Sequence, residues 1–230
     1  MAISNYKYTC NESYFETIDT EDKAYWLGFI YADGNVHSKE TRLRIMLHTR
    51  DAEHLFSFLN CIDSNQKTNL RRIGEQEYIG VEIARMKLAK DLIEKGCVPS
   101  KTFKLQFPSE SILPRNLQRH FIRGYFDGDG CLSTRFRPLK TGVYLDCVFK
   151  LLGTHHMLEN IIRVIPIDNI KLKKNTRSEG IYEFMVYDPK KIIVLMDYLY
   201  EDCQFFLRRK HDKYISDIKH YKKPSGKEVA

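Results

Sequence analysis

Two apolar segments of this chain repeat one another at an offset of 96 residues. The first spans residues 24–34 and the second residues 120–130, and each ends in an aspartate followed by a glycine. Both segments are apolar nearly all round, which predicts helices that are buried rather than amphipathic. A duplicated buried helix predicts two structurally related halves.

The repeated segments also carry small residues four positions apart. Gly28 and Ala32 form the pair in the first segment, and Gly124 and Gly128 form the pair in the second. Residues at i and i+4 lie on one face of a helix, and small residues there allow two backbones to approach closely. Because the pairs occur in register, we predict that the two helices pack against each other through these four residues.

The segments that follow each helix repeat in the same order. In the first half we predict two strands within residues 36–47 (turning at 38–40), a helix near 51–60, a hairpin of 69–73 with 78–84, and a helix over 87–95. The matching elements of the second half are two strands within 131–152, a helix over 155–164, a hairpin of 170–175 with 181–187, and a helix over 189–200.

This order predicts an α+β fold of two pseudo-symmetric αββαββα halves. We place the N-terminal half at residues 1–113 and the C-terminal half at 114–230, with a polar tail from about residue 222. The stretch from 96 to 114 contains three prolines and is the predicted linker.

Each buried helix ends in an Asp-Gly pair. Gly34 and Gly130 suit the left-handed position that often follows a helix. Asp33 and Asp129 would then lie at the negative ends of two helix dipoles, close together if the helices are parallel. A divalent cation would offset both costs, and carboxylate oxygens favour Mg²⁺ or a similar hard ion. An ordinary turn is the alternative for one Asp-Gly pair, but the registered duplication favours a metal site.

The two segments resemble the paired motifs of single-chain LAGLIDADG homing endonucleases. Residues 26–34 (WLGFIYADG) match the first copy and residues 122–130 (IRGYFDGDG) match the second. The resemblance implies that the motif helices pack together, that antiparallel sheets form a DNA-binding saddle, and that Asp33 and Asp129 bind Mg²⁺ or Mn²⁺. The first copy has Tyr31 where the second has Asp127, so we interpret Asp127 as a packing or capping residue.

Members of this family also place a lysine near each scissile phosphate. By order in the chain, the resembling positions are Lys101 and Lys210, with Lys104 and Arg209 as the neighbouring alternatives. A lysine there could orient the attacking water or stabilise the developing charge. A solvated surface lysine is the alternative reading of each.

Basic residues alternate with apolar ones along several predicted strands. Such strands form a sheet with one apolar and one basic face, and a two-stranded ribbon fits the major groove of DNA. A solvated sheet face is the alternative, and a net charge of +7 by itself favours nucleic acid only weakly. The predicted DNA contacts are Arg42, Arg44, Arg71, Arg135, Arg137, Lys171 and Lys173.

Together these features predict a monomeric, site-specific double-strand DNA endonuclease that acts on a long asymmetric target. The alternatives are a non-cleaving DNA-binding regulator, an RNA-splicing maturase on the same fold, which would bind RNA, and a protein-binding α/β module. The six cysteines are scattered without a CxxC pair, and the N-terminus has no apolar core of a signal peptide. We therefore expect a cytoplasmic protein of bacterial or phage origin, or an organellar one, that is neither secreted nor membrane-bound.

Overall fold

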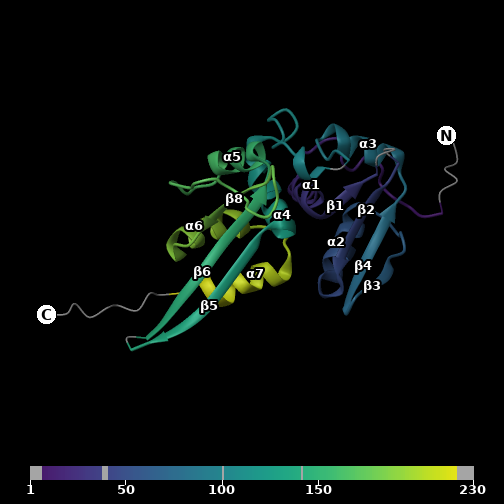
Figure 1. Cartoon of the computed structure of the whole chain (residues 1–230). Coiled ribbons are helices and arrows are strands. Elements are labelled where there is room, and N and C mark those ends of the chain that lie inside the picture. The colour runs from purple at the N-terminus through teal and green to yellow at the C-terminus, as the bar shows by residue number, and fades with distance from the viewer. Residues whose placement is uncertain (1–6, 38–40, 100, 141, 222–230) are drawn as a thin grey trace.

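The computed structural model describes residues 7–37, 41–99, 101–140 and 142–221 (Figure 1). The first half consists of α1 (Glu21–Asp33), β1 (Gly34–Val36), β2 (Leu43–His48), α2 (Ala52–Cys61), β3 (Asn69–Ile73), β4 (Gln76–Ile83) and α3 (Met86–Glu94). The second consists of α4 (Gln118–Asp129), β5 (Cys131–Leu139), β6 (Gly142–Gly153), α5 (His155–Val164), β7 (Lys173–Lys174), β8 (Tyr182–Val186), α6 (Pro189–Tyr200) and α7 (Arg208–Tyr214).

Each half contains one antiparallel sheet of four strands. The strand orders are β1-β2-β4-β3 and β5-β6-β8-β7, so the two sheets have the same topology. The sheets lie on either side of the central pair α1 and α4 (Figure 1). The predicted α+β fold with two αββαββα halves is therefore confirmed.

One predicted element is wrong and one helix was not predicted. The strand expected over residues 170–175 is limited to β7, because an irregular segment precedes it. The sequence reading also missed α7 and the π-helical turn Ile215–Lys219 that continues it. Tyr214 and Ile218, four residues apart, are buried there and hold this extra helix against the second half. The expected turn at residues 38–40 and the polar tail from 222 lie outside the described residues.

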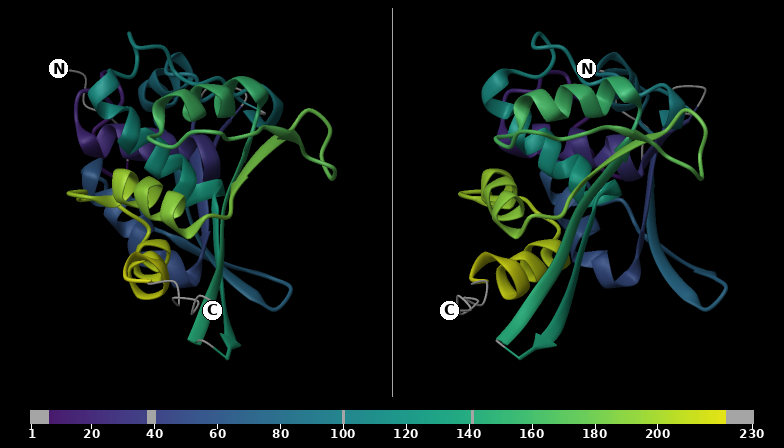
Figure 2. Two further views of the ribbon diagram at one scale, coloured as in Figure 1. Left: turned by 90° about the vertical axis from the view of Figure 1, so that its left-hand side faces the viewer. Right: turned by 60° about the vertical axis from the view of Figure 1, so that its left-hand side comes forward.

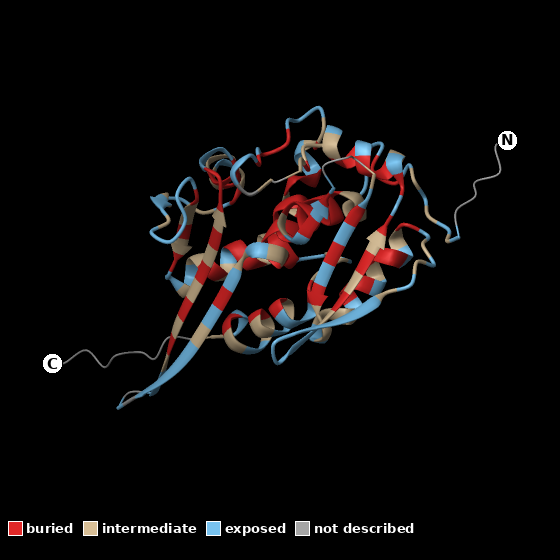
Figure 3. Ribbon diagram, turned by 45° about the vertical axis from the view of Figure 1, so that its right-hand side comes forward, coloured by how far each residue is buried: buried red, intermediate tan, exposed pale blue. Residues whose placement is uncertain are grey.

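The helix pair α1 and α4 forms the centre of the molecule. Eight consecutive residues of α1, from Ala24 to Tyr31, are buried, and the pair appears as the red centre of Figure 3. The two helices run in the same direction and touch through their backbones. A Cβ atom on Gly28 would lie 2.0 Å from the carbonyl oxygen of Phe121, and one on Gly124 would lie 2.0 Å from that of Tyr25.

The same contact continues to the C-terminal ends of both helices. A Cβ on Gly128 would lie 2.2 Å from the Cβ of Ala32. The structure thus places Gly28, Ala32, Gly124 and Gly128 together in one interface. Because larger side chains would separate the helices, the small residues determine how near the two helix ends lie.

The sheets pack their apolar faces against helices and leave the alternate residues exposed. In β2, Leu43, Ile45 and Leu47 are buried, whereas Arg44 between them is exposed. Figure 2 shows α6 and α7, in yellow-green and yellow, on one side of the green β5–β6 hairpin. The alternation of red and blue along the strands in Figure 3 shows the same division.

We predict that Gly124→Ala lowers the free energy of unfolding by about 1–3 kcal/mol or more, because the new methyl group collides with main-chain atoms of α1 that cannot move independently. Gly74→Asn is the control: Gly74 has φ +61° and no atom within 4 Å of an added Cβ, and asparagine tolerates this conformation. Urea denaturation of both variants measures the difference. Equal unfolding midpoints would contradict the assigned helix contact.

Candidate active site

Asp33 and Asp129 are the last residues of the two central helices. Since α1 and α4 are parallel and in contact, both carboxylates belong to one region of the surface. Both aspartates have exposed surface, but neighbouring protein atoms displace much of the water around their carboxylates. This loss of hydration, together with the negative charge of Asp129, raises the pKa of Asp33 to about 6. Loss of hydration also raises the pKa of Asp129, and the charges of Lys101 and Lys210 oppose the rise.

A lysine ammonium group caps each of these helix ends. Lys101 Nζ donates to the carbonyl oxygens of Ile30 at 2.5 Å and Ala32 at 2.7 Å. Lys210 Nζ donates to the carbonyl oxygens of Phe126 at 2.5 Å, Asp127 at 2.8 Å and Gly130 at 2.5 Å. The two lysines therefore occupy corresponding places at the negative ends of the helix dipoles and share one corresponding acceptor, since Ile30 and Phe126 are 96 residues apart.

The two lysines differ in how many donors they retain. An ammonium group has three N–H donors, and Lys210 uses all of them on carbonyl groups. Within the described part of the chain, Lys101 uses two. Burial lowers the pKa of both side chains, that of Lys210 to about 8. Of the neighbouring alternatives, Arg209 is turned toward Asp51 at 3.0 Å, and Lys104 is exposed.

The prediction of left-handed glycines after the two helices is wrong. Gly34 has φ −77° and ψ 154°, and Gly130 has φ −77° and ψ 157°, so both are extended. The chain passes directly from helix to strand, and the lysines bind carbonyl groups at the helix ends. Glycine is required here by space, because a Cβ on Gly130 would lie 2.1 Å from Cδ2 of Phe126.

The donor groups at this site suit a hard divalent cation. The described residues hold no cluster of three or more His, Cys, Asp or Glu side chains arranged for a metal ion. Two carboxylates nevertheless converge at adjoining helix ends, and the charge of Asp129 contributes to the raised pKa of Asp33. A divalent cation between them would relieve this repulsion, and oxygen donors are the ligands that such ions prefer.

Several solved structures have the same overall architecture. I-SmaMI bound to an uncleaved DNA target in the presence of calcium has a TM-score of 0.57 at 13% identity, with 86% of this chain and 89% of that chain covered. The LAGLIDADG homing endonuclease I-LtrWI bound to target DNA has a TM-score of 0.55 at 13% identity (89% and 88% covered). The LAGLIDADG meganuclease I-AabMI bound to uncleaved DNA has a TM-score of 0.54 at 14% identity (84% and 88% covered).

The chain has the LAGLIDADG homing endonuclease fold. By sequence, no family model and no curated protein matches it. The repeated segments of this chain form the central helices α1 and α4, which end at Asp33 and Asp129. The described helices include none that is both long and apolar enough to span a bilayer.

The predicted DNA contacts of the first half lie on the exposed face of its sheet. Arg42 and Arg44 both bind Glu82, at 2.6 and 3.0 Å. Arg71 is exposed in β3, opposite Tyr78 of β4. The carboxylate of Glu82 therefore neutralises part of the positive charge of this face.

The second half has the same pattern with one exception. Arg135 and Arg137 are exposed along β5, and Arg137 forms two hydrogen bonds with Asp146, at 2.8 and 3.1 Å. Lys173 is exposed and faces Glu183 in the strand pairing. Lys171 is exposed but precedes β7, so it does not belong to the strand on which it was predicted.

A buried polar network between the halves escaped the sequence analysis. Arg123 is fully buried in α4 and binds Glu21 of α1 at 2.7 Å. Tyr25 of α1 contacts both His54 and Asp127, at 3.0 and 2.8 Å. Burial lowers the pKa of His54 to about 3, so its ring is neutral. The available signal was the presence of Arg123 and Asp127 in an apolar helix, since buried charges need partners.

We predict that Asp33→Asn stabilises the metal-free protein more at pH 7.5 than at pH 4.5. The pKa of Asp33 is about 6 in the folded state against an ordinary 3.8, so the folded state binds more protons between these values. The contribution of Asp33 to stability therefore falls as pH rises through this window, and asparagine removes that loss. Urea unfolding of both proteins in EDTA at pH 7.5 and pH 4.5 measures the difference in stability.

Asp168→Asn is the control, because Lys191 holds the pKa of that exposed aspartate below its usual value. At pH 7.5 this substitution should slightly destabilise the protein, because it removes an ionised carboxylate that is paired in the folded state. A stability difference for Asp33→Asn that is the same at both pH values would contradict the prediction.

Proposed function

We propose that this protein is a monomeric, site-specific DNA endonuclease that hydrolyses one phosphodiester bond in each strand of a long asymmetric target. The observation that carries the proposal is the pair of carboxylates, Asp33 and Asp129, at the adjoining ends of two parallel helices, each end capped by a lysine. One chain supplies both acids and both lysines, so a monomer suffices.

The exposed sheet faces and the structural relatives support DNA as the substrate. Arg44, Arg71, Arg135 and Arg137 are exposed on strands of both sheets. I-SmaMI, I-LtrWI and I-AabMI, which share the fold, are each bound to DNA. A regulator or maturase on this fold has no need of two intact acids, so the intact pair favours the nuclease.

Asp33 and Asp129 would hold Mg²⁺ or Mn²⁺. Such an ion, when bound, polarises phosphate oxygens and lowers the pKa of coordinated water. The chain's own residues determine whether the carboxylates are ionised and ready to bind it. Lys101 and Lys210 lower the pKa of both aspartates, so their charges favour the ionised form. Lys101 also has one N–H left, within the described part of the chain, to donate to a phosphate or water.

We predict that Asp33→Asn and Asp129→Asn each abolish double-strand cleavage in Mg²⁺ while retaining DNA affinity. Each substitution removes a metal ligand but also removes a negative charge that repels phosphate. Ca²⁺ should support binding with little cleavage, because it accepts the same ligands with longer bonds and looser geometry. Target selection from a genomic DNA library followed by gel cleavage and binding titrations measures this.

Asp19→Asn is the matched control, because Asp19 is an exposed aspartate that pairs with Lys23 before α1 begins. It should cleave like the original protein. Full cleavage by both active-site variants, or unchanged cleavage in excess chelator, would refute the metal assignment.

We also predict that Lys101→Met and Lys210→Met slow cleavage by on the order of 10²-fold, since each removes a fixed positive charge beside the acids. DNA affinity and its salt dependence should change little for Lys210, whose donors are all engaged within the protein. Single-turnover rates and binding at several salt concentrations test both variants. If the lysines only bind DNA phosphates, the rates stay normal and each salt slope falls by about one counterion.

A further inference from the structure

Asp127 is a fully buried carboxylate two residues before Asp129. An ionised carboxylate in such a position is costly unless it is hydrogen-bonded. Three donors from three different elements surround it: the hydroxyl of Tyr25 in α1 at 2.8 Å, the hydroxyl of Tyr200 in α6, and the main-chain N–H of Leu207 at 2.7 Å. Asp127 therefore joins the two motif helices to the segment that leads into α7.

The contact with Leu207 fixes the beginning of α7. Leu207 is the residue immediately before this helix, and its carbonyl oxygen accepts hydrogen bonds from the N–H groups of Lys210 at 2.9 Å and His211 at 3.2 Å. The side chain of Lys210 then returns to the carbonyl oxygen of Asp127 at 2.8 Å. Asp127, Leu207 and Lys210 thus form a closed ring of contacts beside Asp129.

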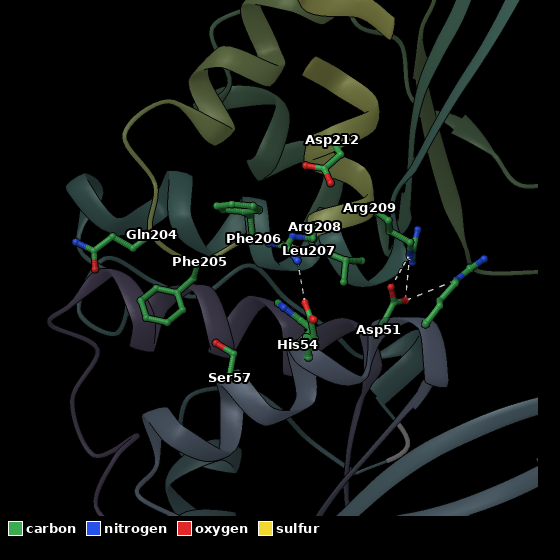
Figure 4. A pocket seen from close by; sticks show the side chains of 12 residues that line it. Asp51, His54, Ser57, Gln204, Phe205, Phe206, Leu207, Arg208, Arg209 and Asp212 are labelled. Atoms are coloured by element: carbon green, nitrogen blue, oxygen red, sulfur yellow. Dashed lines mark hydrogen bonds and ion pairs between the residues drawn. The ribbon is translucent and has the colours of Figure 1, made fainter. Parts of the chain in front are cut away.

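The other contacts of this segment are more exposed. Arg208 binds Glu53 and Arg209 binds Asp51, both across to the first half (Figure 4). The first pair is 75% and 83% exposed, and such surface pairs contribute little to stability. A pocket of about 330 Å³ lies between α2 and this segment, so the packing there is incomplete. Asp127 is accordingly a buried polar anchor at the start of α7, and Arg123 is a second one earlier in the segment, where its Nε donates to the carbonyl oxygen of Phe205 at 2.8 Å.

The described residues of the first half have a different arrangement. Tyr31 occupies the matching position of the first motif, and its hydroxyl donates to the carbonyl oxygen of Lys95 at 2.5 Å. That contact lies six residues before Lys101. Both lysines bind carbonyl groups at their helix ends, but in the described part of the chain only Lys210 is linked to the motif helix through a neighbouring carboxylate.

We propose that Asp127 is a positioning residue for Lys210, so that cleavage of one DNA strand depends on it and cleavage of the other does not. The inference rests on the proposed nuclease function. By binding the N–H of Leu207, the carboxylate fixes the first turn of α7 and places the ammonium group of Lys210 at the end of α4, next to Asp129. The matching position in the first half, Tyr31, has no comparable effect on Lys101.

The primary test is Asp127→Asn in strand-resolved, single-turnover cleavage with Mg²⁺. An amide has one acceptor oxygen and two N–H donors, so it cannot accept from all three groups. We expect the strand that Lys210→Met slows to be slowed by about 10- to 100-fold, with the other strand and the DNA affinity little changed. Nicked plasmid should then accumulate. Equal slowing of both strands would overturn the positioning role.

A second pair of variants tests the donor, the N–H of Leu207, instead of the acceptor. Leu207→Pro and Leu207→Ala both lose the leucine side chain, but only proline lacks the N–H. Leu207 has φ −78°, which proline can adopt. The proline variant should reproduce the strand bias of Asp127→Asn, and the alanine variant should not. The same bias in both, or in neither, would overturn the proposal.

Hydrogen exchange separates this proposal from the nuclease assignment. Asp127→Asn should increase amide exchange in residues 208–214 without changing it in residues 101–103, whether or not the protein cleaves DNA. Failure of the original protein to cleave any target would refute the proposed function alone. Unchanged exchange in residues 208–214 would refute the anchoring role of Asp127 even in an active nuclease.

Discussion

The close approach of α1 and α4 determines where the other parts of the protein lie. Main-chain atoms of Gly28 and Gly124 lie against the opposite helix, and no larger residue fits there. Because the helices are parallel, this contact also brings their C-terminal ends together. The two sheets start at or next to those ends, at Gly34 and Cys131, so their relative placement depends on the same contact.

The helix contact creates an electrostatic problem that the rest of the site addresses. Two helix C-termini and two aspartates concentrate negative charge in one place. Lys101 and Lys210 satisfy carbonyl groups at the helix ends and lower the pKa of the nearby acids. Loss of hydration and the charge of Asp129 outweigh this compensation, since the pKa of Asp33 is still about 6. The remaining imbalance is the property expected of a site that functions with a cation.

The sequence predicts the parts of this arrangement that depend on local pattern. Gly28 and Gly124, with the Asp-Gly ends, suffice to predict the helix pair and the convergence of the acids. The extended conformation of Gly34 and Gly130 could not be predicted locally, because Gly34 pairs with Ile45 in the sheet and the carbonyl oxygen of Gly130 accepts from the distant Lys210. The partners of Asp127 could not be predicted, because its three donors come from distant segments that only the tertiary fold brings together.

On the exposed sheet faces, carboxylates pair with several of the arginines that the proposed function assigns to DNA binding. Glu82 holds Arg42 and Arg44, and Asp146 holds Arg137. A face that bound only phosphate would gain nothing from carboxylates, which repel the DNA backbone. Carboxylates that fix arginine side chains reduce non-specific attraction and orient the guanidinium groups, which is the arrangement required to contact base edges. Under the proposed function, Glu82 and Asp146 therefore favour contact with particular DNA sequences over attraction to phosphate alone.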